Sequence, residues 1–490
     1  MKLHFILLSL LIAIFLFLNV PHLLDLFPVW PDESSLGDVA LGIIRNGKPT
    51  TELWGNLISS VSHEVFWYPP VFLYLLSFWF KFFGFSIVNQ RLLSIVLGCV
   101  FLDVFFIFSK LLINKEAPKI SEIKSAFLAF LGSFLLIIDP TFSKSAIVSR
   151  PEMLIMILVV GAAALVLKML DLKNIHSKLF LVVGGLLVGM APMVHFLAGV
   201  FVLALVFFLA LSERNFFNKK SFWIFVASAA LPSLLWLLTI LPNLSVLSSQ
   251  LNLEAQGRNM TPGWLNMSFT SLPLVYRLSF LIYFIITLTF FVLSALTKRA
   301  HWLLISLMLG AAWMYAFFGK IEWYSVYITP FAYAALILLL VYSIGSKKKL
   351  LMHDLRVSAI SISAVLLILG INNYLSVVSN SADKSYTNFA EKVRSIVPAG
   401  KIVFLSSIPD LYYAFRSDGD YKLYEFPQVK TNQDDFKGLL DYLDYVVINA
   451  PLSNAFIGSM LDNYLQENVI NVIKVDDGGY KVLIYELKHK

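Results

Sequence analysis

Long apolar runs, repeated along most of the chain, limit what this sequence can fold into. Stretches of about twenty mostly apolar residues, the length that crosses a bilayer, recur from Phe5 to about Tyr374. Hydrophobic residues make up 58% of the chain and charged residues 14%, whereas soluble domains have roughly 45–50% apolar and about 25% charged residues. The sequence therefore predicts an α-helical polytopic membrane protein.

We predict about eleven membrane spans from these runs. They lie at about 5–24, 89–112, 124–140, 151–169, 179–193, 196–212, 221–242, 273–296, 302–318, 324–344 and 357–374. The first is interpreted as a retained span, because Pro21, His22 and Leu23 follow it in place of a small-residue cleavage site. The stretch VFLYLLSFWFKFFG after Pro70 is short and aromatic and is interrupted by Lys81, so we expect an interfacial helix in the first outer loop.

The positive-inside rule orients these spans. If the interfacial stretch does not cross, every cluster of Lys and Arg between spans falls on the cytoplasmic side. The clusters are Lys110, Lys115, Lys119 and Lys124; Lys168, Lys173 and Lys178; Arg214, Lys219 and Lys220; Lys298 and Arg299; and Lys347, Lys348, Lys349 and Arg356. The net charge of +7 is then explained by cytoplasmic loops, and no nucleic-acid partner is expected.

The tail changes character at about Ser379, where charged residues become frequent. SYTNFAEKVRSIV reads as a helix, and KIVFLSS, YVVINA, NVIKV and YKVLIYEL read as strands, the last two joined by a DDGG turn. About a hundred residues can hold a core of their own. We therefore divide the chain into a transmembrane domain at 1–374 and a small extracytoplasmic α/β domain at 375–490 that serves as a lid or recognition module.

Two adjacent acids, Asp32 and Glu33, follow a Trp-Pro turn directly after the first span. One interpretation is a helix start, in which Asp32 or Ser34 is the cap and Gly47 ends the helix. The other is function, because ionisable residues near the bilayer are candidates for a functional site. The two interpretations are compatible, since a cap needs only one short polar side chain.

Further polar residues collect at the outer ends of other spans, where the acids also lie. They are Arg150, Glu152, His195, Lys320 and Tyr324. Transfer of a sugar from a phosphate-linked lipid has an anionic leaving group that Arg, Lys or protonated His would bind. Its acceptor is a weak nucleophile that a carboxylate would activate or orient. Arg150, His195 and Lys320 are therefore candidates for binding the donor phosphate.

The order of these motifs resembles the GT-C glycosyltransferase superfamily, and within it the branch of protein O-mannosyltransferases and the lipid A aminoarabinose transferase. PDE follows the first span, an aromatic-PP stretch leads to FFG and Arg91, SRPE follows the third span, and a GM…H turn and Y…TP complete the series. The resemblance covers roughly the membrane part and implies that Asp32 is the catalytic aspartate, with Glu33 as the acid beside it. We therefore expect both Asp32 and Glu33 to be catalytic residues. The resemblance also implies that Arg150 and Glu152 form the basic–acidic pair of the second outer loop.

The chain departs from this pattern at two places. His195 stands where the aminoarabinose enzyme has a phosphate-contacting lysine, and WYPP replaces a Glu-Lys-Pro run. The carboxylate of that run is missing unless His63 or Glu64 reaches into the substrate pocket, which would also include Glu152 and Tyr324. Binding of a divalent metal is therefore left open. The tail does not resemble the sugar-binding repeats of eukaryotic protein O-mannosyltransferases, so protein mannosylation is not implied.

Together these features predict a membrane glycosyltransferase that moves a sugar from a polyprenyl-phosphate donor to an extracytoplasmic acceptor, which can be a lipid, a glycan or a protein. The alternative is a transporter or flippase of a lipid-linked sugar. Such proteins often have inverted repeats and mid-membrane polar residues, whereas here no internal repeat is found and the polar residues gather at one face.

The predicted orientation can be tested with accessibility tags. A tag at Lys490 should be labelled in intact cells, and a tag in the 347–349 loop should be labelled only after the membrane is permeabilised, because an odd number of spans separates the tail from the N-terminus. Equal labelling of the two tags would contradict the orientation and the common outer face of the candidate residues.

Overall fold

The computed structural model describes residues 2–54, 57–61, 63–170, 175–212, 220–257, 273–318, 321–345, 349–416, 420–425, 433–449 and 455–488. Among these residues, eight helices are long and apolar enough to cross a membrane, or up to nine if one bent helix pair counts as a span. The chain is a multi-pass membrane protein, as the apolar runs predict.

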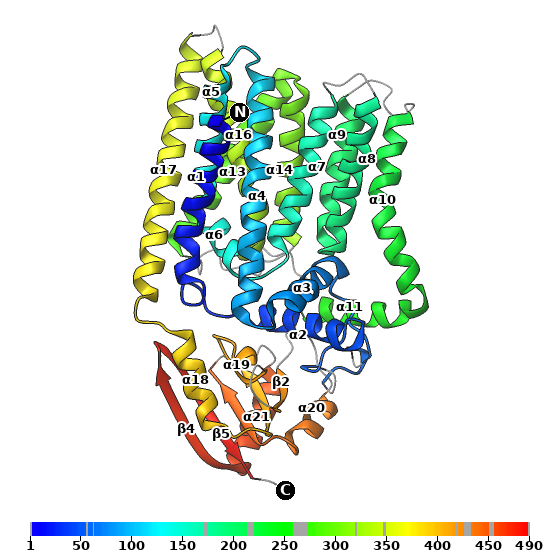
Figure 1. The fold of residues 1–490 in the computed structure, drawn as a ribbon, viewed down its shortest axis with the longest axis vertical. Helices are drawn as coiled ribbons and strands as arrows, with labels where there is room; N and C mark the ends of the chain where they lie inside the picture. The colour runs from blue at the N-terminus through cyan, green and yellow to red at the C-terminus, as the bar shows by residue number, and fades with distance from the viewer. Residues whose placement is uncertain are drawn as a thin grey trace.

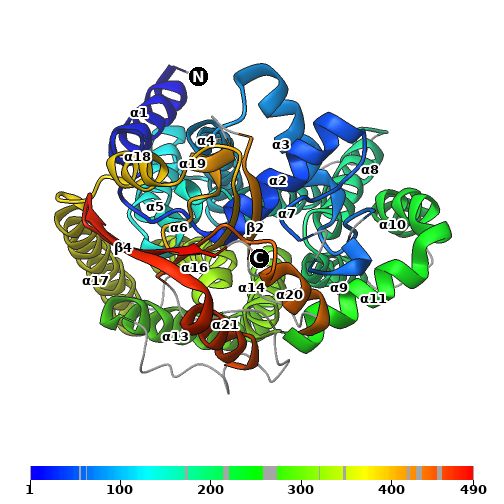
Figure 2. The ribbon, with the colours of Figure 1, turned by 90° about the horizontal axis from the view of Figure 1, so that it is seen from below.

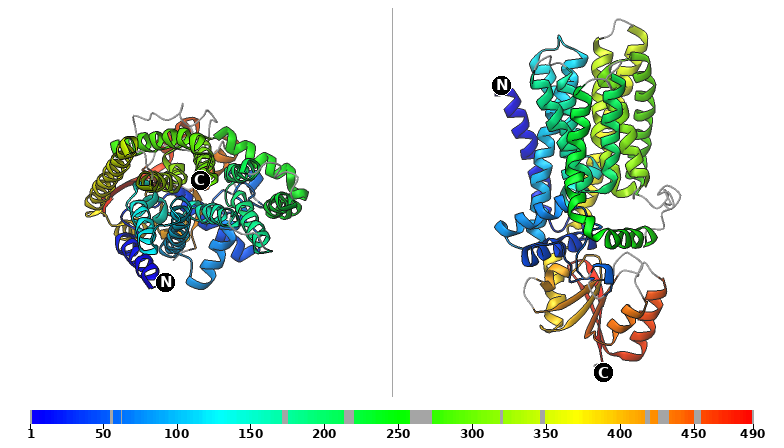
Figure 3. Two further views of the ribbon diagram at one scale, coloured as in Figure 1. Left: turned by 90° about the horizontal axis from the view of Figure 1, so that it is seen from above. Right: turned by 90° about the vertical axis from the view of Figure 1, so that its right-hand side faces the viewer.

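The long helices stand side by side as a bundle (Figure 1 and Figure 3). They are α1 (Lys2–Asn19), α4 (Ile87–Glu116), α5 (Glu122–Ile137), α7 (Glu152–Met169), α8 (Ile175–Met190), α9 (Gly199–Ser212), α10 (Lys220–Ile240), α13 (Leu274–Thr297), α14 (Ala300–Phe318), α16 (Thr329–Gly345) and α17 (Lys349–Ser381). Each predicted span overlaps one of these helices. Because α8 and α9 belong to the shorter apolar helices, the count of eleven spans stays a prediction.

The predicted span at 124–140 is not one straight helix. Helix α5 stops at Ile137, and α6 (Pro140–Ile147) continues at an angle of 71°. Pro140 lacks the N–H that a continuing helix would need, and the Asp139 side chain accepts hydrogen bonds from the backbone N–H groups of Thr141 and Phe142 (2.9 and 3.0 Å). The break turns α6 across the end of the bundle.

Three helices form a layer across one end of the bundle: α2 (Pro31–Asn46), α3 (Pro70–Phe83) and α11 (Leu244–Gly257) (Figure 1). The interfacial position predicted for the stretch after Pro70 is confirmed, since α3 lies beside α2 and outside the bundle. Gly47 ends α2 in the left-handed region (φ 73°), as predicted.

The start of α2 differs from the capping interpretation. The helix begins at Pro31, with Trp30 as the N-cap, and the Glu33 carboxylate accepts the Trp30 backbone N–H (3.0 Å). Asp32 and Ser34 therefore lie within the first turn, and the expectation that one of them caps the helix is wrong. A Pro at the first helical position explains the earlier start, because its fixed φ suits a helix and it needs no partner for an N–H.

The C-terminal part folds as the predicted α/β unit beneath this layer (Figure 1 and Figure 2). Its five-stranded sheet has the order β2-β1-β3-β5-β4, in which β1 pairs in parallel with β2 and β3, and β5 pairs antiparallel with β3 and β4. The strands are β1 (Ile402–Ser406), β2 (Lys422–Glu425), β3 (Tyr445–Ile448), β4 (Val469–Asp477) and β5 (Tyr480–Leu487). The helices are α18 (Tyr386–Ile396), α19 (Tyr412–Arg416), α20 (Gln433–Leu440) and α21 (Ala455–Asn468). The β4–β5 hairpin is confirmed, whereas β2 was not predicted.

The described members of the basic clusters lie at the end of the bundle opposite to the α/β unit. Lys110 and Lys115 end α4, Lys168 ends α7, and Lys298 and Arg299 connect α13 to α14, and these helix ends lie away from the sheet (Figure 1). The separation of charge that the positive-inside rule uses is therefore present in the fold. Which end faces the cytoplasm stays a prediction.

Helix α19 connects the α/β unit to α2 and α4 through two tyrosine hydrogen bonds. The Tyr412 hydroxyl donates to Asp38 Oδ1 (2.7 Å) and the Tyr413 hydroxyl donates to Gln90 Oε1. Tyr413 approaches α2 at Gly37, where a Cβ atom would lie 2.0 Å from the Tyr413 hydroxyl. Only glycine allows this approach without moving the tyrosine.

We expect Gly37→Ala to weaken this contact and to destabilise the protein by about 1–3 kcal/mol, the usual cost of overpacking. Gly438→Ala in α20 is the matched control, since a Cβ atom at this position would meet no described atom within 4 Å. This substitution should stabilise the helix by about 0.5–1 kcal/mol. Thermal unfolding of the two purified variants measures the difference, and equal shifts would contradict this account of Gly37.

Candidate functional site

The two adjacent acids of α2 have opposite surroundings. The Asp32 side chain is 42% exposed, and the Glu33 side chain is fully buried. Successive residues of a helix point about 100° apart, so the first turn of α2 presents one carboxylate to the open side and the other to the interior.

Glu33 forms a buried, two-point ion pair with Arg91 of α4. Arg91 Nε donates to Glu33 Oε1 (2.9 Å) and Arg91 Nη2 to Glu33 Oε2 (2.6 Å), and both side chains are fully buried. The other three guanidinium hydrogens go to the backbone carbonyls of Leu23, Phe27 and Pro28 at 2.8 to 3.0 Å. Glu33 Oε1 also accepts the backbone N–H of Ser149 (2.9 Å). The pair thus joins the exit of α1, α2, α4 and the loop before α7.

Arg150 holds Asp32 from the facing loop. Its Nη1 donates to Asp32 Oδ2 (2.7 Å), and its Nε donates to Glu152 Oε1 (2.9 Å). Glu152 is buried at the first turn of α7 and so fixes the guanidinium from behind. Among the described residues these bonds occupy two of the five N–H donors of Arg150, which leaves donors for an anionic ligand.

An aromatic wall with a second cation stands beside Arg150. The Arg150 guanidinium lies over the Trp323 ring (4.5 Å to the centroid), and Lys144 Nζ lies 3.6 Å from the same centroid and 5.7 Å from that of Trp30. Trp323 belongs to α15 (Ile321–Tyr324), and Lys144 belongs to α6, the helix that follows the bend after α5. Two cations so close together, both against aromatic faces, make a surface suited to an anion.

His195 reaches the same region through Tyr324. His195 Nε2 lies 3.3 Å from the Tyr324 hydroxyl, and the Arg150 guanidinium lies 5.9 Å from the Tyr324 ring centroid. His195 also packs against Tyr315. The structure therefore brings together five of the residues predicted from sequence: Asp32, Arg150, Glu152, His195 and Tyr324.

The remaining predicted residues are not part of this cluster as far as the structure describes it. Lys320 lies outside the described residues. The His63 side chain is exposed, and Glu64 is half-buried, with Lys48 and Tyr74 as its electrostatic neighbours. Burial raises the pKa of Glu64 above its ordinary value, and Lys48 partly opposes this. No group of three or more His, Cys, Asp or Glu side chains among the described residues could hold a metal ion.

The sequence analysis missed Lys144 as a candidate and gave Arg91 no role. Lys144 lies six residues before Arg150, in the segment that follows the predicted span at 124–140. Its proximity to Arg150 was a usable signal, but the bend of α6 that brings it to Trp323 was not visible in the hydropathy pattern. Arg91 lies near the start of a long apolar helix, where a buried cation requires a buried anion.

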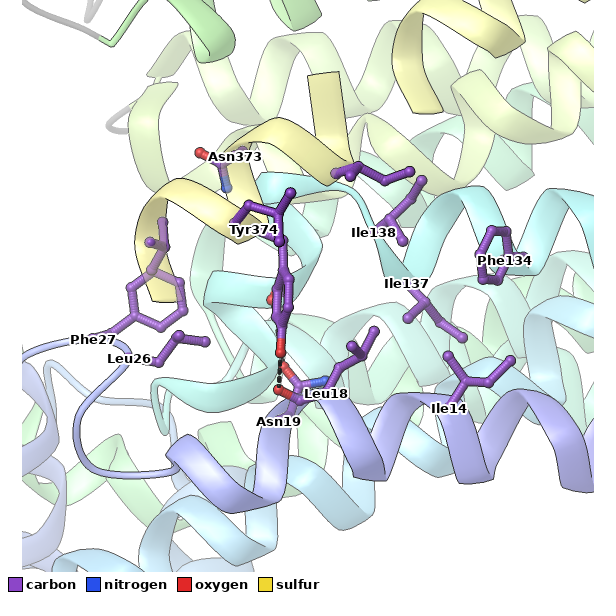
Figure 4. Close-up of a pocket in the computed structure, with 14 residues that line it drawn as sticks. Ile14, Leu18, Asn19, Leu26, Phe27, Phe134, Ile137, Ile138, Asn373 and Tyr374 are labelled. Atoms are coloured by element: carbon purple, nitrogen blue, oxygen red, sulfur yellow. Dashed lines mark hydrogen bonds between the residues drawn. The ribbon is translucent and has the colours of Figure 1, made fainter. Parts of the chain in front are cut away.

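An apolar cavity of about 240 Å³ lies on the other side of α6, between α1, α5 and α17 (Figure 4). Its lining is mostly aliphatic and aromatic, and the Tyr374 hydroxyl at its edge donates to the Leu18 carbonyl (3.0 Å). Ser143 of α6 lines the cavity, whereas the next residue, Lys144, contacts the aromatic wall. One short helix therefore separates an apolar space from a cationic surface.

The contrast between the two acids gives a stability test. Glu33→Ala and Arg91→Ala should each destabilise the protein by about 3–5 kcal/mol, because each leaves a buried charge without its partner. Asp32→Ala should cost less than about 1 kcal/mol, the range of partly exposed ion pairs. Denaturant unfolding of the purified variants measures these values. A loss for Asp32→Ala as large as that for Glu33→Ala would contradict the different roles assigned to the two carboxylates.

Comparison with known proteins identifies the fold. No protein-family model matches the sequence, and no curated protein matches it. Among solved structures, ArnT from Cupriavidus metallidurans bound to undecaprenyl phosphate is similar over 97% of both chains, with a TM-score of 0.60 and 14% identity. The archaeal oligosaccharyltransferase AglB from Archaeoglobus fulgidus, in complex with an inhibitory peptide and a dolichol-phosphate, is similar over 99% of this chain and 74% of its own, with a TM-score of 0.58 and 11% identity. Both neighbours belong to the GT-C superfamily, and this chain has the GT-C fold that the order of its motifs predicts.

Proposed function

We propose that this protein is a membrane glycosyltransferase that moves a sugar from a polyprenyl-phosphate donor to an acceptor at the end of the bundle that carries the α/β unit. The observation that carries the proposal is the partly exposed Asp32 carboxylate, held by Arg150 beside a cationic and aromatic wall. We place this end outside the cytoplasm, and the acceptor can be a lipid, a glycan or a protein. The two GT-C neighbours, which were solved with undecaprenyl phosphate and dolichol-phosphate, support a lipid phosphate as the donor.

The donor phosphate is assigned to the cationic side of this site. Arg150 offers a planar pair of donors that matches a phosphate, and Lys144 adds a second positive charge near the same indole ring. His195 is a third candidate through its contact with Tyr324, and Lys320 is retained as a fourth from the sequence alone. The apolar cavity on the other face of α6 suits a segment of the isoprenoid chain, because apolar ligands favour such linings.

Asp32 is assigned to the acceptor. In this mechanism the acceptor oxygen forms a bond to the anomeric carbon of the sugar while the bond from that carbon to the phosphate oxygen breaks. Asp32 takes the proton of the acceptor hydroxyl, and the polyprenyl phosphate leaves with the electron pair. Arg150 stabilises the charge that develops on the phosphate, and Glu152 holds Arg150 in place from behind.

We propose that Glu33 positions Asp32 and does not contact the substrate. Its two oxygens receive Arg91 Nε and Nη2, the Ser149 N–H and the Trp30 N–H. Both oxygens are therefore engaged by donors of the chain itself and face away from the open side of the site. The same bonds fix the first turn of α2, so Glu33 determines where the Asp32 carboxylate lies.

Asp32→Asn tests the assignment. The amide has nearly the same shape, so folding should be preserved, and turnover should fall by about a hundredfold or more if general-base catalysis contributes its usual share. The measurement is transfer by purified protein in lipid nanodiscs with a panel of polyprenyl-phosphate sugars, and Glu391→Gln on the exposed face of α18 is the matched control. Near-normal transfer by monodisperse Asp32→Asn protein would overturn the catalytic role of Asp32.

The same panel separates this function from transport. An enzyme releases free polyprenyl phosphate and adds a fixed mass to an acceptor. A transporter or flippase moves the intact lipid-linked sugar between the leaflets of a proteoliposome without cleaving it. Movement without cleavage would contradict the proposed function.

A further inference from the structure

The edge of the α/β unit that faces α2 carries a pair of buried carboxyls. Asp410 lies in the segment that follows β1, and Glu425 is the last residue of β2, so both lie at the carboxyl ends of neighbouring parallel strands. Their exposed fractions are 0% and 3%. Glu425 also donates its backbone N–H to the carbonyl of Leu53 in the loop after α2 (3.4 Å), which places the pair at the contact between the two parts of the chain.

The two buried carboxyls are electrostatic neighbours of each other, and a hydrogen bond between them would need a proton on one of them. Asp410 Oδ1 accepts the Ser34 hydroxyl (2.5 Å) and the Tyr412 backbone N–H (2.8 Å), and these bonds favour its charged form. Asp410 Oδ2 and Glu425 Oε2 are buried and receive no bond from another described amide, hydroxyl or cation. The proton therefore belongs on Glu425.

The electrostatic surroundings agree with this assignment. Burial, followed by Asp410, Asp32 and Asp38, raises the pKa of Glu425 well above its ordinary value, and burial raises the pKa of Asp410 to about 6. The titratable groups that face the pair are Asp32, Glu33 and Asp38 from α2, Tyr386 from α18, and Tyr412 and Tyr413 from α19. The three carboxylates among these groups, Asp32, Glu33 and Asp38, disfavour a second negative charge on the Asp410–Glu425 pair.

The pair touches the part of α2 that carries Asp32. Ser34, which bonds Asp410, is two residues after Asp32, and the Asp410 backbone N–H donates to the carbonyl of Val29, just before the N-cap of α2 (2.8 Å). Arg91 and Glu33 hold the same turn from the bundle side. The first turn of α2 is thus fixed from both sides, once by the membrane part and once by the α/β unit.

We propose that Glu425 is a positioning residue of the α/β unit: it donates a hydrogen bond to Asp410 and, through Ser34, holds the first turn of α2 so that Asp32 keeps its place against Arg150. The expected effect on sugar transfer rests on the proposed function, whereas the hold on the first turn of α2 rests on the described contacts alone. It gives the α/β unit a role in the reaction without any substrate-contacting residue of its own.

The pH dependence has a defined sign. Since the folded-state pKa values of both carboxyls lie above their ordinary values, the stabilisation from this pair is fully present at low pH. It is lost as the pH rises through the folded-state pKa of Glu425, when a second negative charge appears beside Asp410. The hold on α2 should therefore loosen on the alkaline side.

The test uses the full-length protein in nanodiscs with Glu425→Gln, Glu425→Ala and the exposed control Glu391→Gln. Hydrogen exchange of the peptide that covers the start of α2 is followed across pH as protection factors, which correct for the intrinsic rate, and transfer is measured in parallel. Wild type and Glu391→Gln should lose protection at alkaline pH. Glu425→Gln keeps a donor that does not titrate, so it should keep protection there.

Glu425→Ala should lose protection at every pH and should lower kcat by about ten- to a hundredfold, the scale of a small misplacement of a catalytic group, with a smaller change in the KM for the donor. If Glu425→Ala does not fold, Glu425→Gln alone decides. The proposal is overturned if Glu425→Gln loses protection at the same pH as wild type, or if folded Glu425→Ala keeps wild-type protection and kcat. If the protection pattern is as expected but wild type transfers no sugar, the proposed function fails and the positioning role stands.

Discussion

The buried ion pair between Glu33 and Arg91 is the interaction on which the arrangement of the site depends. Removing two charges from water is costly, and a buried pair is tolerated only where the remaining hydrogen-bonding groups are satisfied. Here all five donors of Arg91 have acceptors, three of them backbone carbonyls between α1 and α2. The first turn of α2, which carries Asp32, is therefore fixed to α4, a helix of 30 residues within the bundle, and gains the rigidity of the bundle.

This arrangement separates two tasks between neighbouring carboxylates. Glu33 provides structure, because its bonds to Arg91, Ser149 and Trp30 use both oxygens and leave it without exposure. Asp32 remains partly open to solvent and is held by one cation. The rigid neighbour fixes the position of the exposed carboxylate, which the catalytic role that we propose for Asp32 would need.

The sequence predicted the parts of the structure that depend on local pattern. Apolar runs located the helices of the bundle, aromatic composition and Lys81 identified α3 as interfacial, and DDGG identified the β4–β5 hairpin. It placed Asp32, Arg150 and His195 at span ends, and these residues do meet. It failed at the start of α2, where a local contact, Glu33 accepting the Trp30 N–H, replaces the expected cap. It also failed at β2, a four-residue strand that depends on its pairing with β1.

Lys144 and Glu425 were missed for the same physical reason. Lys144 stands six residues before Arg150 in the sequence, but nothing local shows that the two side chains meet. A glutamate in a charged tail has no local feature that distinguishes it from a solvated residue. Lys144 becomes part of the cationic wall only because α5 breaks at Asp139 and α6 turns by 71°. In a straight helix the five steps from Asp139 to Lys144 would carry the chain about 7–8 Å farther along the bundle axis, and the bend redirects them across it.

The carboxylates at this end of the molecule differ in how many hydrogen bonds they accept from the chain itself. Asp139 accepts two backbone N–H groups, the Thr141 hydroxyl and the hydroxyls of Tyr283 and Tyr333. Asp38 accepts two backbone N–H groups and the hydroxyls of Thr51 and Tyr412. Each of these carboxylates is buried, and its negative charge is stabilised by donors of the chain itself. In the described part of the chain, Asp32 receives only Arg150 and is partly exposed, which agrees with the general-base role that we propose for it.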